Sequence, residues 1–151
     1  MANVVVYREN DKRCLILKRS ISEKVHPGKW CEPGGKMEWN QLPINKPTRL
    51  NGDVLDYENS IEELLAREVL EEANVIISRN IKYINSVAFI RPDEIPVVLV
   101  KFAAIYQSGE AKPETGVFDE LAWVNATEIK NYDCILGIPQ EIEQTINLFK
   151  K

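Results

Sequence analysis

The stretch "GGKMEWNQLPINKPTRLNGDVLDYENSIEELLAREVLEEANV" occupies residues 34–75 and joins a glycine pair to a strongly acidic segment. Between residues 58 and 72 there are six glutamates and one arginine, a local charge of −5 in a chain whose net charge is −4. Like charges three and four residues apart on a helix repel one another unless something compensates them. This segment is therefore the most informative part of the sequence for both fold and function.

The acidic segment predicts a helix from Ser60 to Ala73. Ser60 and Glu63 match a capping box, and asparagine tolerates the left-handed conformation of a helix end, so we expect the helix to stop at Asn74. An apolar stripe at helical spacing supports this prediction and consists of Ile61, Leu64, Leu65, Val69 and Leu70.

Three glutamates near the end of this helix form a candidate metal site. Glu68 and Glu72 are one turn apart and Glu71 follows Glu68 by three residues, so the three carboxylates share one side of the helix. Such hard oxygen ligands suit Mg²⁺ or Mn²⁺, and magnesium commonly binds beside substrate phosphates. An acidic helix is more often a solvated surface. The glycine pair at residues 34–35 favours the metal site, because a backbone carbonyl there could complete the ligand set.

The two ends of the stretch resemble the Nudix box. "GGKME" at 34–38 and "REVLEEANV" at 67–75 are similar to its pattern of Gly, five residues, Glu, seven residues and Arg-Glu-Uaa-x-Glu-Glu-x-Gly-Uaa, where Uaa is aliphatic. The preceding "PGKWCEPGG" at 27–35 is similar to the lead-in of many members. This resemblance to MutT-like Nudix hydrolases implies an α/β fold, an α/β/α sandwich with a mixed β-sheet.

The resemblance also implies roles for individual residues. The Gly35 carbonyl, Glu68, Glu71 and Glu72 would bind Mg²⁺, or alternatively Mn²⁺, and Arg67 would orient a glutamate, so that Arg67 and the three glutamates are the candidate catalytic residues. The general base is left open between Glu68 and an acidic residue outside the box. The candidates outside the box are Glu114, Asp119 and Glu120.

An insertion separates the two ends of the motif. Arg67 lies 32 positions after Gly35 instead of 14, so 18 residues have been added. The insertion, at about residues 39–57, is polar and turn-rich, and we expect low order there. It is either a tolerated surface loop or a substrate-binding loop, and these two interpretations are evenly balanced. The candidate substrate-binding residues are Trp39, Lys46 and Arg49 in the insertion and Trp30 before it, although Trp30 between two strands is more often buried packing.

Two further positions depart from the box. The final glycine is replaced by Asn74, a mild change because asparagine adopts the same backbone conformation. The first glutamate of the box falls on Asn59. Either Glu58 or Glu63 then replaces it as the partner of Arg67, or this ion pair is missing and activity is reduced.

The rest of the chain predicts strands that alternate with turns, in a single domain of residues 1–151. The loop-like segment "VHPGKWCEPGG" at 25–35 is rich in proline and glycine, and Pro139 opens a final helix. The predicted strands are "NVVVY" at 3–7, "CLILKR" at 14–19, "YINSVAFI" at 83–90, "IPVVLVKFAAIY" at 95–106 and "ELAWV" at 120–124.

The composition limits the classes of molecule that this chain is expected to bind. A net charge of −4 argues against binding to a nucleic acid polymer, which usually requires a basic surface. Three widely spaced cysteines predict a reducing, cytoplasmic setting. No signal peptide or apolar run of membrane-spanning length is present, so no membrane is expected. The expected partner is a small-molecule nucleotide or nucleoside diphosphate derivative, and a homodimer is left open.

The resemblance implies a pyrophosphohydrolase that cleaves a nucleoside diphosphate linked to another group. The favoured substrate is a nucleoside or deoxynucleoside triphosphate, yielding monophosphate and pyrophosphate, because the chain is small and lacks motifs associated with NADH or coenzyme A. The metal would neutralise phosphate charge while a glutamate activates the attacking water. One alternative is a Nudix-like module that binds a nucleotide or metabolite with weak or no turnover. Another is an acidic helix used only as a protein interaction surface, without metal.

Overall fold

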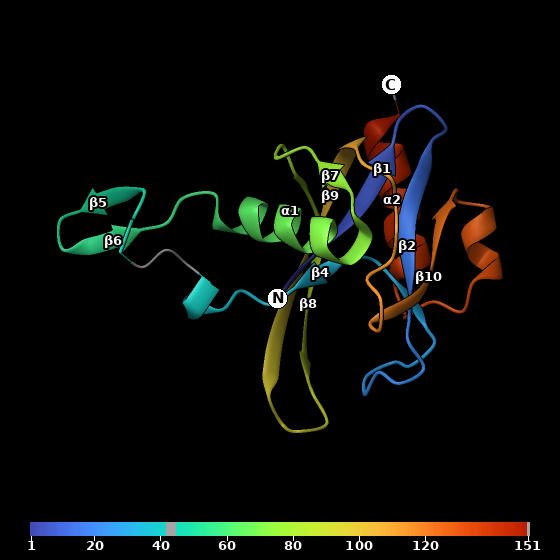
Figure 1. Ribbon diagram of the computed structural model, residues 1–151, viewed down its shortest axis with the longest axis horizontal. Coiled ribbons are helices and arrows are strands. Elements are labelled where there is room, and N and C mark those ends of the chain that lie inside the picture. The colour runs from blue at the N-terminus through green and yellow to red at the C-terminus, as the bar shows by residue number, and fades with distance from the viewer. Residues whose placement is uncertain (42–44, 151) are drawn as a thin grey trace.

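The computed structural model describes residues 1–41 and 45–150 and contains two helices packed against a mixed β-sheet (Figure 1). The helices are α1 (Ser60–Ala73) and α2 (Ile138–Phe149), and the short 3₁₀ helices are η1 (Trp39–Gln41) and η2 (Glu128–Asn131). The strands of the main sheet are β1 (Ala2–Arg8), β2 (Arg13–Arg19), β3 (Trp30–Cys31), β4 (Gly34–Gly35), β7 (Ile76–Ile77), β8 (Lys82–Ile90), β9 (Pro96–Ser108) and β10 (Phe118–Val124). A separate hairpin consists of β5 (Arg49–Asn51) and β6 (Val54–Asp56).

The main sheet has the order β10-β2-β1-β9-β7, with β3 paired to β2, β4 to β1 and β8 to β9. β1 and β9 are parallel, with Val4 opposite Phe102, and the other pairs are antiparallel. The predicted strands are confirmed at β1, β2, β8, β9 and β10. The mixed sheet of the α/β/α prediction is confirmed as well.

Each face of the sheet has its own apolar core because side chains alternate along a strand. On one face Val4 and Val6 of β1 belong to a buried cluster with Leu65 of α1. On the other face Val5 of β1 belongs to a cluster with Ile142 of α2. All five side chains are at most 1% exposed, and burying each one contributes about 1.5–3 kcal/mol. The continuous apolar run of β1 is thus explained by a strand covered on both faces.

The predicted bounds of α1, Ser60–Ala73, are confirmed, whereas the predicted capping box is wrong. Asn74 adopts φ 53° and its backbone N–H donates to the Leu70 carbonyl at 3.0 Å. At the other end the capping residue is Asn59, with φ 57° and no side-chain capping bond. The Ser60 hydroxyl instead donates to the Tyr57 carbonyl. The capping box therefore does not form, because the chain enters the helix through a left-handed residue one position earlier.

The proline- and glycine-rich segment before the glycine pair is more regular than predicted. Trp30–Cys31 and Gly34–Gly35 form two short strands that extend the sheet beside β2 and β1. This pairing depends on long-range partners, so local composition could not indicate it. The glycine pair is consequently part of the sheet.

The insertion carries regular structure where low order was expected. β5 and β6 form an antiparallel hairpin in which Leu50 lies opposite Leu55. Figure 1 shows this hairpin projecting away from the sheet, beyond the start of α1. Residues 42–44 of the insertion lie outside the described residues. Within the described ranges, no helix is both long and apolar enough to cross a membrane.

Replacing residues 48–57 with a short Gly-Ser linker is predicted to leave the melting temperature within a few degrees of that of the unmodified chain, because β5 and β6 pair only with each other. By contrast, Leu65→Ala should lower the free energy of unfolding by about 2–5 kcal/mol, since its side chain is fully buried. Thermal and urea denaturation measure both effects. A hairpin deletion as damaging as Leu65→Ala would contradict this assignment.

Candidate active site

Helix α1 lies against the glycine pair at very short range. A Cβ atom added to Gly35 would lie 2.4 Å from the carboxylate carbon of Glu68. A Cβ at Gly34 would lie 2.4 Å from the carbonyl oxygen of Ala2. Neither position has room for a side chain, so the two glycines permit the contact between β1, β4 and α1. The two ends of the split motif therefore meet in space, as predicted.

Glu72 is the most perturbed carboxylate at this contact. Its Oε2 accepts a hydrogen bond from the Gly34 backbone N–H at 3.0 Å. Burial raises the pKa of Glu72 to about 8, the Gly34 bond opposes this shift, and the nearby charges of Glu68 and Glu114 increase it. A buried carboxylate with like-charged neighbours is the environment in which a bound cation restores the ionised form.

Arg67 lies beside two of the predicted metal ligands. Its Nη2 is 2.7 Å from Oε1 of Glu68, and its Nε is 3.8 Å from Oε1 of Glu71. The Glu68 side chain is 16% exposed and that of Glu71 is 58% exposed. Arg67 can thus orient Glu68, which is the role that the resemblance implies.

Both candidate replacements for the missing glutamate of the box form ion pairs with other arginines. Glu58 pairs with Arg49 at 2.9 Å, and Glu63 pairs with Arg79 at 3.0 Å. Both glutamates are held by arginines outside the motif. Sequence spacing could not reveal these partners, because Arg49 lies in the inserted hairpin and Arg79 follows the helix.

The structure brings only part of the predicted metal site together. In residues 1–41 and 45–150, no three His, Cys, Asp or Glu side chains form a group that could hold a metal ion. Glu68 and Glu72 lie at the glycine pair, whereas Glu71 is at the surface. The residues nevertheless fit a divalent cation, because hard oxygen donors lie close together where the Glu72 carboxylate is buried beside like charges. The complete ligand set stays a prediction.

The candidate bases outside the box are separated by the structure. The Glu114 backbone N–H donates to the Glu72 carbonyl at 2.9 Å, and its charge acts on the Glu72 carboxylate. Asp119 accepts a bond from the Ile21 N–H at 3.4 Å, and Glu120 pairs with Lys18 at 2.5 Å. Of the three candidates, Glu114 is therefore the one that lies beside α1, the helix that carries the candidate metal ligands.

The candidate substrate-binding residues are dispersed. Trp30 is 8% exposed and its ring meets the edge of Tyr132, with centroids 4.9 Å apart, which supports the packing interpretation. Trp39 is 76% exposed and Lys46 is exposed. Arg49 forms ion pairs within and beside its hairpin. Substrate binding by these four residues remains a prediction.

Three buried charged residues were missed by the sequence analysis. Lys101 Nζ lies between Glu32 Oε1, at 2.9 Å, and Glu141 Oε2, at 2.7 Å. The available signal was a lysine inside the apolar run "VVLVKFAAIY", where an unpaired ammonium could not be buried. Its partners come from β3–β4 and α2, so their identity required the fold.

Comparison with known proteins identifies the family of this chain. The NUDIX domain profile matches residues 1–137, and the chain belongs to this family. Solved structures with the same fold include a MutT protein and a hydrolase of the NUDIX family. No curated protein sequence matches this chain.

Solved structures share the fold over nearly the whole chain. A MutT protein from Methanosarcina mazei Go1 is 24% identical, with a TM-score of 0.66, covering 99% of this chain and 94% of that one. The NUDIX domain of Shewanella oneidensis NrtR, complexed with ADP ribose, is 17% identical, with a TM-score of 0.71 and coverages of 99% and 86%. An Ap4A hydrolase from C. elegans is 13% identical, with a TM-score of 0.58 and coverages of 97% and 96%.

Gly35→Ala is predicted to impair activity, whereas Gly34→Ala is predicted to impair stability. The new methyl group in Gly35→Ala would displace the movable Glu68 carboxylate, so folding should survive while metal-dependent activity falls. In Gly34→Ala it would meet the Ala2 backbone, which cannot move as easily, so stability should fall. Thermal denaturation and initial rates distinguish the variants. A fully active Gly35→Ala protein would contradict the close contact.

Millimolar Mg²⁺ or Mn²⁺ is predicted to raise the melting temperature relative to chelator, because a ligand that binds only the folded state stabilises it. Glu72→Gln should show a smaller gain, since this change removes a buried acceptor of the proposed site. Glu120→Gln, on β10, is the matched control and should behave like the unmodified protein. Identical melting curves in metal and chelator would contradict the assignment.

Proposed function

We propose that this chain is a Mg²⁺-dependent pyrophosphohydrolase, able to use Mn²⁺, that converts a nucleoside or deoxynucleoside triphosphate to the monophosphate and pyrophosphate. The observation that carries the proposal is the placement of Glu68 and Glu72 against the backbone of the glycine pair. Here the buried Glu72 carboxylate lies close to the like charges of Glu68 and Glu114. A phosphate-bound divalent cation supplies positive charge at this position.

The proposed metal is held by Glu68, Glu71, Glu72 and the Gly35 carbonyl. When bound, it neutralises the charge of the phosphates and polarises the phosphorus centre. Glu71 is exposed and close to Arg67, so its side chain can rotate toward the cation without disturbing the core. Arg67 holds Glu68 through a 2.7 Å ion pair and thereby keeps one carboxylate in a fixed orientation.

A proton acceptor is needed to activate the attacking water, and two carboxylates are available. Glu68 lies directly at the glycine pair. Glu114 approaches from the loop before β10, where its backbone N–H is fixed to the end of α1. We favour Glu114 as the base, because Glu68 is already engaged by Arg67 and by the proposed metal.

Nucleotide ligands among the similar structures support the substrate class. One similar structure contains ADP ribose and another is an Ap4A hydrolase. Both compounds carry a pyrophosphate unit attached to adenosine. A nucleoside triphosphate carries the same unit in a ligand smaller than ADP ribose or Ap4A, which suits a chain of 151 residues.

A second candidate function is nucleotide binding with weak or no turnover. The observation that favours it is Asn59 at the position of the first glutamate of the box, with Glu58 and Glu63 bound to other arginines. Arg67 contacts Glu68 and Glu71, which follow it on the same helix. The rate of hydrolysis then depends on how well these contacts orient Arg67.

Glu72→Gln, Glu68→Gln and Glu114→Gln are each predicted to lower kcat/KM by about 10²–10⁴, the range expected for loss of a group that binds charge or transfers a proton. The assay follows phosphate-containing products from a panel of nucleotides in Mg²⁺, with Glu120→Gln as the control. Near-normal turnover in Glu72→Gln would contradict the proposed metal site. Binding of the panel without any product in the unmodified protein would establish the second candidate function.

A further inference from the structure

Strand β8 lies at an edge of the main sheet and extends beyond it together with β9. Among the described strands β8 pairs with β9 alone, and on its other side β9 is paired with β1 only from Val100 onward. The two strands therefore continue past the end of β1 as a two-stranded hairpin, which projects from the sheet in Figure 1. We call residues 87–99 the arm.

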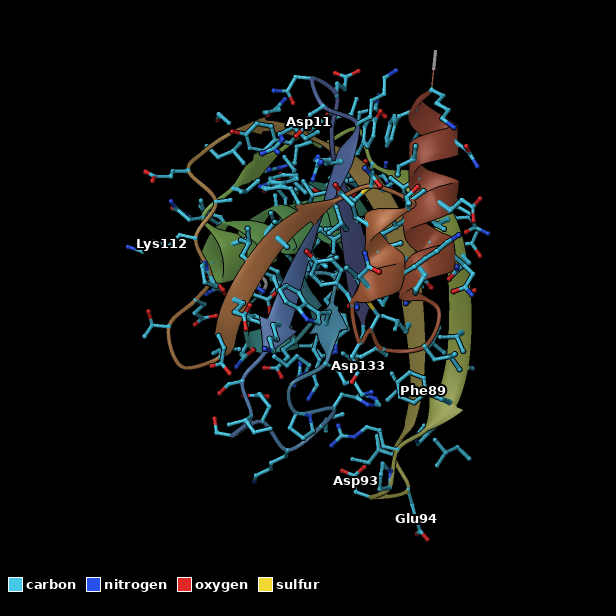
Figure 2. The ribbon with its side chains drawn as sticks, turned by 90° about the vertical axis from the view of Figure 1, so that its right-hand side faces the viewer. Asp11, Phe89, Asp93, Glu94, Lys112 and Asp133 are labelled. Atoms are coloured by element: carbon cyan, nitrogen blue, oxygen red, sulfur yellow. The ribbon has the colours of Figure 1, made fainter. Side chains whose placement is uncertain are left out.

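The arm carries apolar side chains that the rest of the chain does not cover. Asn85 donates to Glu141 of α2 at 3.4 Å, so α2 reaches β8 at this residue. Beyond it, Figure 2 shows Phe89 below the N-terminal end of α2. Large apolar side chains that are 40–74% exposed occur along the arm, at Val87, Phe89, Ile90, Ile95 and Val98. An exposed apolar surface of this kind marks a site of interaction.

The sequence of β8 lacks the features that keep edge strands from pairing with other chains. Natural proteins protect such edges with charged residues, proline, bulges or short strands. No charged residue or proline occurs from Tyr83 to Ile90, and the pairing with β9 is regular over residues 85–90. By contrast, β10 at the opposite edge carries Asp119 and Glu120, and β7 has only two residues. Strand β8 is therefore an unprotected edge.

The charges at the two ends of β8 are complementary to each other. Lys82 begins the strand, and Glu94 lies at the tip of the arm, where Arg91 is paired with Asp93 at 2.7 Å. Lys82 and Glu94 are exposed, and neither has an ion-pair partner within residues 1–41 and 45–150. A strand with a cation at one end and an anion at the other matches a second copy of itself that runs in the opposite direction.

We propose that two copies of this chain form a symmetric dimer in which their β8 strands pair antiparallel, centred near Val87. Lys82 of each copy then lies close to Glu94 of the other, and the apolar side chains of the two arms cover one another. The pairing also satisfies the N–H and C=O groups that β8 turns away from β9. Because both copies use the same surface, the assembly closes at the dimer.

The inference is independent of the proposed hydrolysis, because no residue of the arm belongs to the candidate metal site. The first test is sedimentation velocity of the unmodified protein at about 1–100 μM, a range that detects micromolar association. We expect a monomer–dimer equilibrium with the dimer dominant at the highest concentration. A monomer throughout this range, or aggregates of increasing size, would overturn the proposal.

Val87→Lys tests the position of the interface. It places a lysine on the edge strand, where two copies of it would meet at the centre of the dimer, so the Kd of the dimer should rise at least about 10-fold. Val54→Lys, at a 58% exposed valine of the inserted hairpin, is the matched control and should leave the dimer unchanged. Loss of the dimer in Val54→Lys, or an unchanged dimer in Val87→Lys, would contradict pairing through β8.

A charge exchange tests the antiparallel direction. Glu94→Lys replaces two attractive pairs by two repulsive ones and should weaken the dimer about 10-fold. Combining it with Lys82→Glu restores opposite charges and should return the Kd to within about 3-fold of that of the unmodified protein. A double variant as weak as Glu94→Lys alone, or no effect of Glu94→Lys, would overturn the proposed arrangement.

Amide hydrogen exchange provides a measurement that requires no variant. Backbone N–H groups within residues 85–90 that point away from β9 should exchange more slowly at about 100 μM than at about 1 μM protein, because pairing protects them. The amides of β10, at the opposite edge, should exchange at the same rate at both concentrations. Exchange of residues 85–90 that does not depend on protein concentration, in a protein that sediments as a dimer, would overturn the proposal.

Discussion

The contact between α1 and the glycine pair is the constraint on which the candidate site depends. Because neither glycine carries a Cβ atom, the side chains of Glu68 and Glu72 can reach the backbone of β4. The cost of the contact is visible in the raised pKa of Glu72. A helix and a strand packed only for stability would not bury a carboxylate beside two like charges. The stability of the two apolar cores therefore offsets the cost of burying a carboxylate where a cation can bind.

Two kinds of sequence signal predicted most of the fold. Alternating and continuous apolar runs located the long strands, and the stripe along residues 61–70 located α1, because these patterns reflect burial on one or two faces. Asn74 marked the end of the helix because few other residues adopt its left-handed conformation. The short strands β3 and β4 could not be predicted in the same way, since two residues carry no periodicity and their partners are distant.

The candidate site was predictable where the motif is local and unpredictable where partners come from elsewhere. The spacing of Glu68, Glu71 and Glu72 placed them on one helix, but their unequal exposure depends on how α1 packs against β4. The partners of Glu58 and Glu63 are arginines outside the motif. The buried cluster of Glu32, Lys101 and Glu141 joins three elements that no sequence spacing relates. The insertion leaves the motif intact in space because both of its ends return to α1 and β4.

The most direct test of a metal site between α1 and the glycine pair is an anomalous-scattering map of crystals soaked in Mn²⁺. Such a map locates the ion without reference to activity. We expect a peak within bonding distance of Glu68, Glu72 and the Gly35 carbonyl, with the Glu71 side chain turned toward it. A strong peak elsewhere on the molecule, with none beside the glycine pair, would contradict a metal site at this contact.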